Sequence, residues 1–166
     1  LSEKSLATAL REGGYATWHV GKWHLGGEAT WPEKHGFDVN VAGCQMGHPN
    51  HGYFAPYKIP TLPDGPDGEY LTDRLTDEAI KLIENHRGKP FFLNLWHYAP
   101  HTPIQAPEHL IEKYRAKAKR LKLDQINPIV AGEHFPCEHK RKEHVQRRII
   151  QSSPEYAAMM ENIDTN

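Results

Sequence analysis

The chain has 166 residues, a length typical of one domain or of a piece of a larger one. Hydrophobic residues make up 38% of the sequence, and no apolar run approaches the roughly 20 residues that a membrane-spanning helix needs. This composition excludes an integral membrane protein of the helical type. The two cysteines, Cys44 and Cys137, are too few for a disulfide-rich scaffold, and they leave the cellular compartment open.

The formal net charge of −1 conceals an uneven distribution of charge along the chain. Residues 113–148 contain eleven Lys and Arg against four Asp and Glu, whereas the rest of the chain contains nine against seventeen. A basic segment of this kind could bind a polyanion such as nucleic acid or a sulfated sugar. Lysines that alternate with alanines on a helix are more typical of a solvated face, which is the interpretation that we favour.

The first elements are predicted from short patterns near the N-terminus. Apolar residues at helical spacing over 6–10 predict a short helix, with Ser2 as its cap and the two glycines at 13–14 at its end. Residues 15–20 are aromatic and β-branched and lie between glycines, a pattern that predicts a buried strand. Another short strand is expected at residues 37–41.

The middle of the chain is predicted to hold a long loop, a helix and a strand. Residues 44–68 are rich in proline and glycine and show no periodicity, so we expect a long loop there. Loops of this length in compact domains often have a function. An apolar stripe from Leu71 to Ile83 predicts a helix, with Thr72 as its cap. The continuous apolar run at 90–96 predicts a strand that is covered on both faces.

Two further helices are predicted toward the C-terminus. Pro107 marks the start of a helix that runs into the basic segment, and the remainder of that segment is predicted to be irregular. Ser153 as cap and Pro154 in the first turn predict a final helix that is still running at Asn166. The alternation of helices with strands indicates the α/β class.

Lys22 and His24 follow the strand predicted at 15–20. Residues two apart on an extended segment point the same way, so an ammonium and an imidazole would project together from the carboxyl end of a strand, where α/β folds build their sites. Such a pair suits an anionic oxyacid ester, because lysine neutralises charge and histidine moves a proton near neutral pH. The competing interpretation is a surface lysine beside a packed histidine.

A second candidate site follows the strand predicted at 90–96. His101 lies in the run His97-Tyr98-Ala99-Pro100-His101-Thr102-Pro103, where two prolines would stiffen a loop that presents the imidazole. His101 could act as a general acid, although a loop histidine without any role is as common.

Cysteines and histidines at short spacings raise the alternative of a zinc site. The candidate ligands are Cys44, His48, His51, His134, Cys137 and His139. Their spacing is irregular and no paired C-x2-C knuckle occurs, so we do not favour this alternative and name no metal ligand in the chain. Two of the residues, His48 and His51, are instead weak candidates for substrate recognition, because they lie in the long loop.

The motifs together resemble the type I sulfatases, the formylglycine-dependent hydrolases of the alkaline phosphatase-like superfamily. Gly14-Tyr15-Ala16-Thr17 with Gly21-Lys22-Trp23-His24-Leu25-Gly26 is similar to the second signature of that family. The segment from Pro90 to Pro103 resembles its later strand and catalytic histidine loop, and residues 156–164 resemble the helix that follows. The least familiar stretch is 121–150.

The resemblance implies a partial α/β sandwich around a mixed, mostly parallel sheet. It implies that residues 1–166 are an internal fragment of one catalytic domain whose parent hydrolyses sulfate esters, with a sulfated carbohydrate as the expected substrate. By resemblance, Lys22 and His101 bind the sulfate, His24 helps to break down the sulfated intermediate, and His101 helps to protonate the leaving alcohol. The resemblance also implies that the loop holding His48 and His51 lines the substrate cleft, which makes the two histidines weak candidates for sugar recognition.

Several features of the family are missing from this sequence. The Cys/Ser-x-Pro-x-Arg motif that yields formylglycine and the calcium-binding aspartates are absent, so calcium and formylglycine are expected outside this chain, and the fragment alone is expected to be inactive. The segment 137–141 has Cys and Arg at the motif's spacing, but His139 replaces the proline. The resemblance further implies a periplasmic or secreted protein without nucleic-acid or membrane partners, and it leaves the oligomeric state open.

Two other functions are compatible with the sequence. A phosphatase or phosphonate hydrolase of the same superfamily would use similar residues, because phosphate and sulfate esters share tetrahedral geometry and anionic oxygens. A non-catalytic polyanion-binding module would use residues 113–148 and would show binding that depends on salt.

Overall fold

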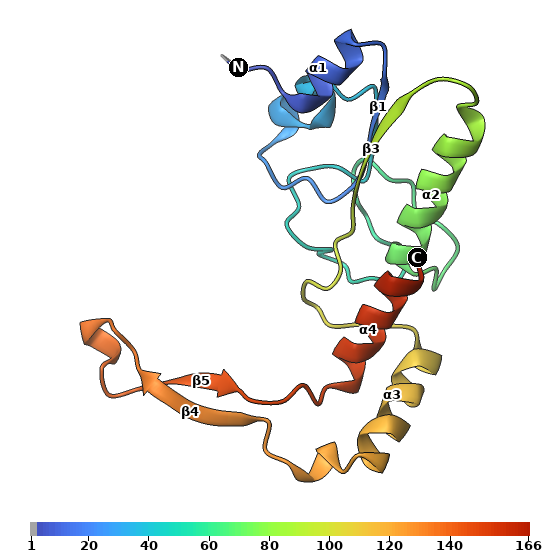
Figure 1. Cartoon of the computed structure of the whole chain (residues 1–166). Coiled ribbons are helices and arrows are strands. Elements are labelled where there is room, and N and C mark those ends of the chain that lie inside the picture. The colour runs from blue at the N-terminus through green and yellow to red at the C-terminus, as the bar shows by residue number, and fades with distance from the viewer. Residues whose placement is uncertain (1–2) are drawn as a thin grey trace.

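The computed structural model describes residues 3–166, which form an α/β body and a projecting hairpin (Figure 1). The helices and strands are α1 (Leu6–Glu12), β1 (Ala16–Gly21), β2 (Val39–Val41), α2 (Leu71–Asn85), β3 (Phe91–Trp96), α3 (Glu108–Arg120), β4 (Ile129–His134), β5 (His144–Arg148) and α4 (Pro154–Thr165). Short 3-10 helices lie at Glu28–Thr30, Pro32–His35, Leu123–Gln125 and Glu138–Lys140. The predicted α/β class is confirmed.

The sheet of the body has three parallel strands in the order β2-β1-β3. β1 and β3 pair along their whole length, from Ala16 opposite Phe91 to Gly21 opposite Trp96. Because the three strands run in the same direction, their carboxyl ends lie at one edge of the sheet.

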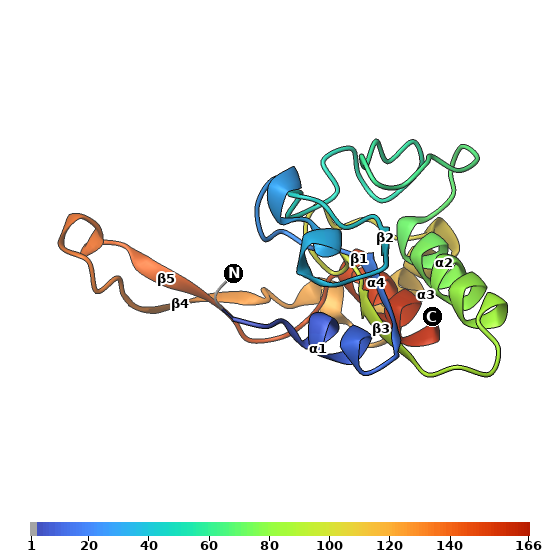
Figure 2. The same ribbon diagram turned by 90° about the horizontal axis from the view of Figure 1, so that it is seen from above.

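The two faces of the sheet are covered by different elements. On one face α2 and residues of α4 form the main core, to which Val20, Leu75 and Met159 belong. On the other face the short helix α1 covers a smaller apolar cluster that contains Ala7 and Phe37. Figure 2 shows α1 and α2 on opposite sides of the strands. β1 is therefore buried on both faces, as predicted for residues 15–20.

Of the two predicted helix caps that lie within the described residues, one is confirmed and one is wrong. Ser2 lies outside the described residues, and Ser5 caps α1 by accepting a hydrogen bond from the backbone N–H three residues on. The prediction for Thr72 is wrong, because its side chain is buried in the first turn of α2 and Tyr70 occupies the cap position. Ser153 caps α4 as predicted.

Among residues 3–166, no helix is long and apolar enough to cross a bilayer.

β3 lies where it was predicted, but it is not covered on both faces. Phe91 and Trp96 are 38% and 47% exposed. The reason is that β1, rather than β3, lies in the middle of the described sheet, and that α1 is too short to cover the whole outer face.

The basic segment is also more ordered than expected. β4 and β5 form an antiparallel hairpin where the sequence predicted irregular structure. A register shift between Ala131 and His134 interrupts the alternation of apolar and polar residues that would have revealed the strands.

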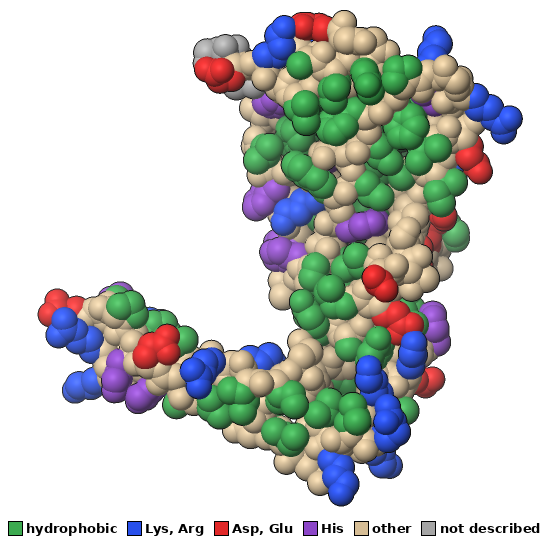
Figure 3. All heavy atoms as spheres, viewed as in Figure 1, with side chains coloured by type: hydrophobic (Ala, Val, Ile, Leu, Met, Phe, Trp, Pro, Cys, Tyr) green, Lys and Arg blue, Asp and Glu red, His purple; other side chains and the backbone are tan. Residues whose placement is uncertain are grey.

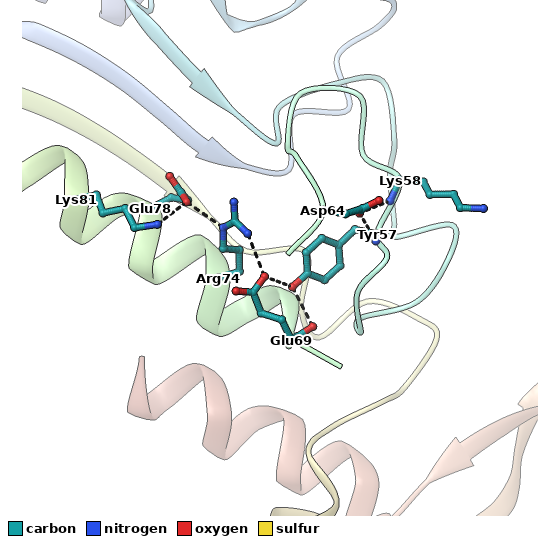
Figure 4. A network of polar contacts seen from close by, with 7 residues as sticks. All are labelled: Tyr57, Lys58, Asp64, Glu69, Arg74, Glu78 and Lys81. Atoms are coloured by element: carbon teal, nitrogen blue, oxygen red, sulfur yellow. Dashed lines mark hydrogen bonds and ion pairs between the residues drawn. The ribbon is translucent and has the colours of Figure 1, made fainter. Parts of the chain in front are cut away.

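Residues 44–68 form the predicted long loop, which polar contacts fix to α2 (Figure 4). The Tyr57 hydroxyl donates to the backbone carbonyl and to Oε2 of Glu69, both at 2.9 Å. Arg74 of α2 binds the same carboxylate through Nη1 at 3.0 Å and binds Glu78 through Nε at 2.9 Å. At the far end of the loop Asp64 accepts the backbone N–H of Tyr57 at 2.6 Å. The loop is thus a folded part of the body.

His19 is a fully buried histidine in the middle of the sheet. Its Nε2 lies 3.0 Å from the carbonyl oxygen of Gly21, and its Nδ1 lies 2.9 Å from Nδ2 of Asn94 on β3. A neutral ring that donates from Nε2 and accepts at Nδ1 satisfies both contacts. Burial lowers the pKa of His19 to about 4, against smaller opposing effects that include the hydrogen bond to Gly21.

The lowered pKa of His19 predicts acid destabilisation. The unfolded chain binds a proton at His19 below about pH 6.5, whereas the folded chain does so only near pH 4, so stability is lost as the pH falls through this window. We expect this histidine to contribute a loss of about 2 kcal/mol between pH 7 and pH 5. Urea unfolding followed by tryptophan fluorescence at both pH values measures it.

His19→Gln should reduce that pH dependence, even though the variant is less stable at neutral pH. His139→Gln, which changes an exposed histidine of the hairpin, serves as the control and should retain it. An unchanged pH dependence in the His19 variant would show that another group is responsible.

Candidate functional site

Lys22 is fixed at the point where β1 leaves the sheet. Gly21 has a φ of 106°, and a Cβ atom there would lie 1.8 Å from the carbonyl oxygen of Trp96. Only glycine allows this approach. The next backbone N–H, that of Lys22, donates to the same carbonyl at 2.7 Å. The end of β1 is therefore tied to the end of β3, and the Lys22 side chain starts from a fixed position.

His24 is held by the loop that follows β2. Its backbone has a φ of 58°, and its N–H donates to the carbonyl of Cys44 at 2.9 Å. The imidazole lies against the backbone of Gly47, where a Cβ atom would approach ring atoms to 2.5–2.8 Å. His24 is thus in a left-handed conformation. The prediction that Lys22 and His24 point the same way assumed an extended segment, and that assumption is wrong.

Lys22 and His24 nevertheless line one open pocket. The pocket has a volume of about 360 Å³ and lies at the carboxyl ends of β1 and β3. Its lining residues are Lys22, Trp23, His24, Leu25, Trp96 and His97.

His101 is presented by a loop that tyrosines of the body hold in place. The buried Tyr53 donates its hydroxyl to the His101 carbonyl at 2.9 Å, and the buried Tyr98 donates to the carbonyl of Ala42 at 2.8 Å. The His101 ring is exposed, and its Nδ1 lies 3.0 Å from the carbonyl oxygen of Thr102. An Nδ1–H that donates to this carbonyl leaves Nε2 free to exchange a proton with a bound molecule.

His48 connects the His101 loop with the pocket. The rings of His48 and His101 are stacked, with centroids 5.4 Å apart and an angle of 14° between their planes. His48 directly follows Gly47, on which the His24 ring packs. The exposed residue His51 makes none of these contacts. The structure therefore brings Lys22 and His24 together in the pocket and places His48 against His101, whereas neither His48 nor His101 is among the residues that line the pocket. In Figure 3 histidine and cationic side chains lie together on one side of the body.

His97 and Trp96 line the pocket, although no role was predicted for either residue. Burial lowers the pKa of His97, against the charge of Asp73, which raises it. Nδ1 of His97 is buried and has no hydrogen-bond partner among the described residues. The only signal for both residues in the sequence was their position at the carboxyl end of a strand.

The described residues do not supply a metal site of their own. Residues 3–166 contain no group of three or more His, Cys, Asp or Glu side chains that could hold a metal ion. Cys44 is buried beside Tyr98, and Cys137 lies at the far turn of the hairpin, so the zinc alternative has no structural support. The same finding means that the described part of the chain does not fit a calcium site.

Comparison with known proteins gives consistent matches along the chain. The Sulfatase family model matches residues 1–166. Arylsulfatase J of Mus musculus is 32% identical over 133 residues, which cover 70% of this chain and 22% of that protein. N-acetylglucosamine-6-O-sulfatase of Bacteroides thetaiotaomicron is 33% identical over 111 residues, which cover 65% of this chain and 19% of that protein.

A solved structure shows the same fold. The crystal structure of Ps i-CgsB superimposes with a TM-score of 0.61 at 22% identity, covering 99% of this chain and 34% of that one. The chain thus spans about a third or less of the length of these relatives. The match of the family model to the whole sequence identifies the chain as a member of the sulfatase family, with the alkaline phosphatase-like fold.

Proposed function

We propose that the protein to which this chain contributes hydrolyses sulfate esters of carbohydrates. The observation that carries the proposal is the meeting of Lys22 and His24 in one pocket, with His101 joined to it through His48. The substrate class is supported by the names of relatives, which include an N-acetylglucosamine-6-O-sulfatase and an N-acetylgalactosamine-6-sulfatase. A crystal structure of Ps i-CgsB contains k-i-k-neocarrahexaose.

Each of the three residues has a role that follows from its chemistry. The Lys22 ammonium binds the sulfate and offsets negative charge in the transition state. His101 donates a proton from Nε2 to the leaving alcohol, which is otherwise a poor leaving group. His24 would hydrogen-bond a nucleophile that the rest of the protein supplies, and its imidazole could hold or move a proton beside it.

The long loop would contribute to substrate recognition. His48 lies next to His101, so its exposed ring can contact the sugar that carries the sulfate. His51 lies in the same loop and would reach only a more distant part of the substrate.

The remaining parts of the site would come from the rest of the protein. We propose that residues 1–166 are an internal fragment of a single catalytic domain, and that the formylglycine nucleophile and the calcium ligands lie outside it. The fragment matches about a fifth of the two curated relatives described above. Residues 137–141, which have Cys and Arg at the nucleophile motif's spacing, lie on the hairpin. The fragment alone would then bind sulfate weakly and would not turn it over.

The acid role of His101 is testable in the full-length protein. His101→Ala should slow hydrolysis of sulfated sugars by about 10²–10⁴-fold, the usual contribution of a general acid. Hydrolysis of 4-nitrophenyl sulfate should fall less, because its leaving group departs without protonation. Measuring kcat for a series of leaving groups separates the two, with His139→Ala on the hairpin as a control. Equal losses for good and poor leaving groups would contradict an acid role.

The position of the His24 ring is testable without changing His24. Gly47→Ala adds a methyl group that must displace the ring, because the added atom would otherwise lie within 2.5–2.8 Å of it. We expect kcat to fall by about 10–100-fold, since a displacement near 1 Å can cost that much. Stability should change little, because a side chain rather than backbone must move.

Gly27→Ala is the matched control for this experiment. Gly27 has a φ of −76° and nothing within 4 Å of an added Cβ atom, so this variant should keep full activity. If Gly47→Ala were as active as Gly27→Ala, the His24 ring would not be part of the reacting site.

A further inference from the structure

The hairpin of β4, β5 and their connecting turn forms an arm, residues 129–148, that projects from the body (Figures 1 and 2). Its two strands pair with each other rather than with the sheet. A two-stranded hairpin that stands alone is only marginally stable in water. Within the described residues most side chains of the arm are exposed.

The arm and the end of α3 carry a concentration of unpaired positive charge. Residues 117–150 contain nine Lys and Arg against four Asp and Glu. None of these nine cations forms an ion pair within residues 3–166. By contrast, Lys113 and Arg115 at the start of the basic segment bind Glu161 and Glu108. The segment thus divides into a first part that is neutralised within the fold and a second part that is not.

The strand register places polar groups of the arm in a row. Alternate residues of β5 share one face, so Arg148, Gln146 and His144 lie along it. His134 of β4 joins them, with its ring centroid 4.0 Å from that of His144. Nδ1 of the exposed His144 lies 2.7 Å from the Gly132 carbonyl oxygen, which leaves Nε2 without a partner in that contact.

Three consecutive cations at the far turn extend the charged surface. Lys140, Arg141 and Lys142 are all exposed. A single exposed cation contributes little to binding, about 0–1 kcal/mol. A polymer that bears repeated anions gains from each contact, because every neutralised charge releases a counterion. The arm therefore suits a polyanion far better than a small anion.

The arm extends from the body at an open angle (Figure 3). In the same view histidine side chains of the body lie on the side that faces the arm. A long molecule whose one sulfate occupies the pocket of Lys22 and His24 can run from there toward the arm.

We propose that the arm and the end of α3 form a second anion-binding surface, which holds further sulfate groups of a polymeric substrate while one sulfate reacts in the pocket. This inference rests on the proposed function and specifies its substrate class as a sulfated polysaccharide rather than a small sulfate ester. The surface contributes affinity and selection for long chains, and it takes no part in bond breaking.

The test compares two triple variants of the full-length protein. The arm variant is Lys140→Gln, Lys142→Gln and Arg148→Gln, and the control variant is Lys34→Gln, Lys89→Gln and Arg87→Gln. Both remove two lysines and one arginine from exposed positions, so their net charges are equal. Thermal unfolding midpoints establish that each variant is folded.

Binding and activity are then measured with defined probes. Affinity for long-chain dextran sulfate is measured over a series of salt concentrations, and hydrolysis is measured with 4-nitrophenyl sulfate. We expect the arm variant to bind dextran sulfate about tenfold more weakly, with a logarithmic salt slope smaller by about two. Its hydrolysis of 4-nitrophenyl sulfate should match that of the control variant, because the arm does not touch the pocket.

Three results would overturn the inference. The first is that the two variants bind dextran sulfate with equal affinity. The second is that the unaltered protein binds unsulfated dextran as tightly as it binds dextran sulfate. The third is that it binds double-stranded DNA more tightly than dextran sulfate at the same salt concentration. Failure of the unaltered protein to hydrolyse any sulfate ester would contradict the proposed function instead. The binding comparison does not depend on that result, so the two failures are distinguishable.

Discussion

The parallel pairing of β1 with β3 is the constraint on which the candidate site depends. It ends with Gly21 packed against the Trp96 carbonyl, an approach that a side chain at Gly21 would prevent. Lys22 leaves β1 at this point and His97 leaves β3 at the same point, so two segments more than seventy residues apart in sequence open into one pocket. The buried, neutral His19 supports this edge from inside the sheet through its contacts with Gly21 and Asn94.

Buried tyrosine hydroxyls hold the loops around the sheet in place by hydrogen bonds to backbone carbonyls. Tyr53 and Tyr98 each donate to a backbone carbonyl in a different loop, and Tyr70 donates to the carbonyl of Gln105 at 2.7 Å. Each such bond contributes about 1 kcal/mol, and leaving the carbonyl unpaired in the interior would cost at least as much. Loops without regular structure can therefore present His48 and His101 in fixed positions.

The outcome for the fold shows where sequence patterns are informative. β1 has a β-branched and aromatic composition between glycines, α2 has an apolar stripe and α4 has a clear cap, and all three were predicted. The arm was missed because its bulge breaks the alternation, and Thr72 was misassigned because a threonine near a helix start can either cap the helix or face the core. The exposure of β3 depends on which strands flank it, and this is not a property of its own sequence.

The sequence by itself determined the family and the residue types of the site, because the motifs around Lys22, His24 and His101 are short and local. Only the tertiary structure decided that His48 stacks on His101, that His24 lies on Gly47, and that His51 stays apart from them. These contacts join segments that are distant in the chain, and they depend on strand order and on the path of a long loop. Local sequence does not encode the path of this loop, because the loop is held by contacts with residues that are distant in the chain.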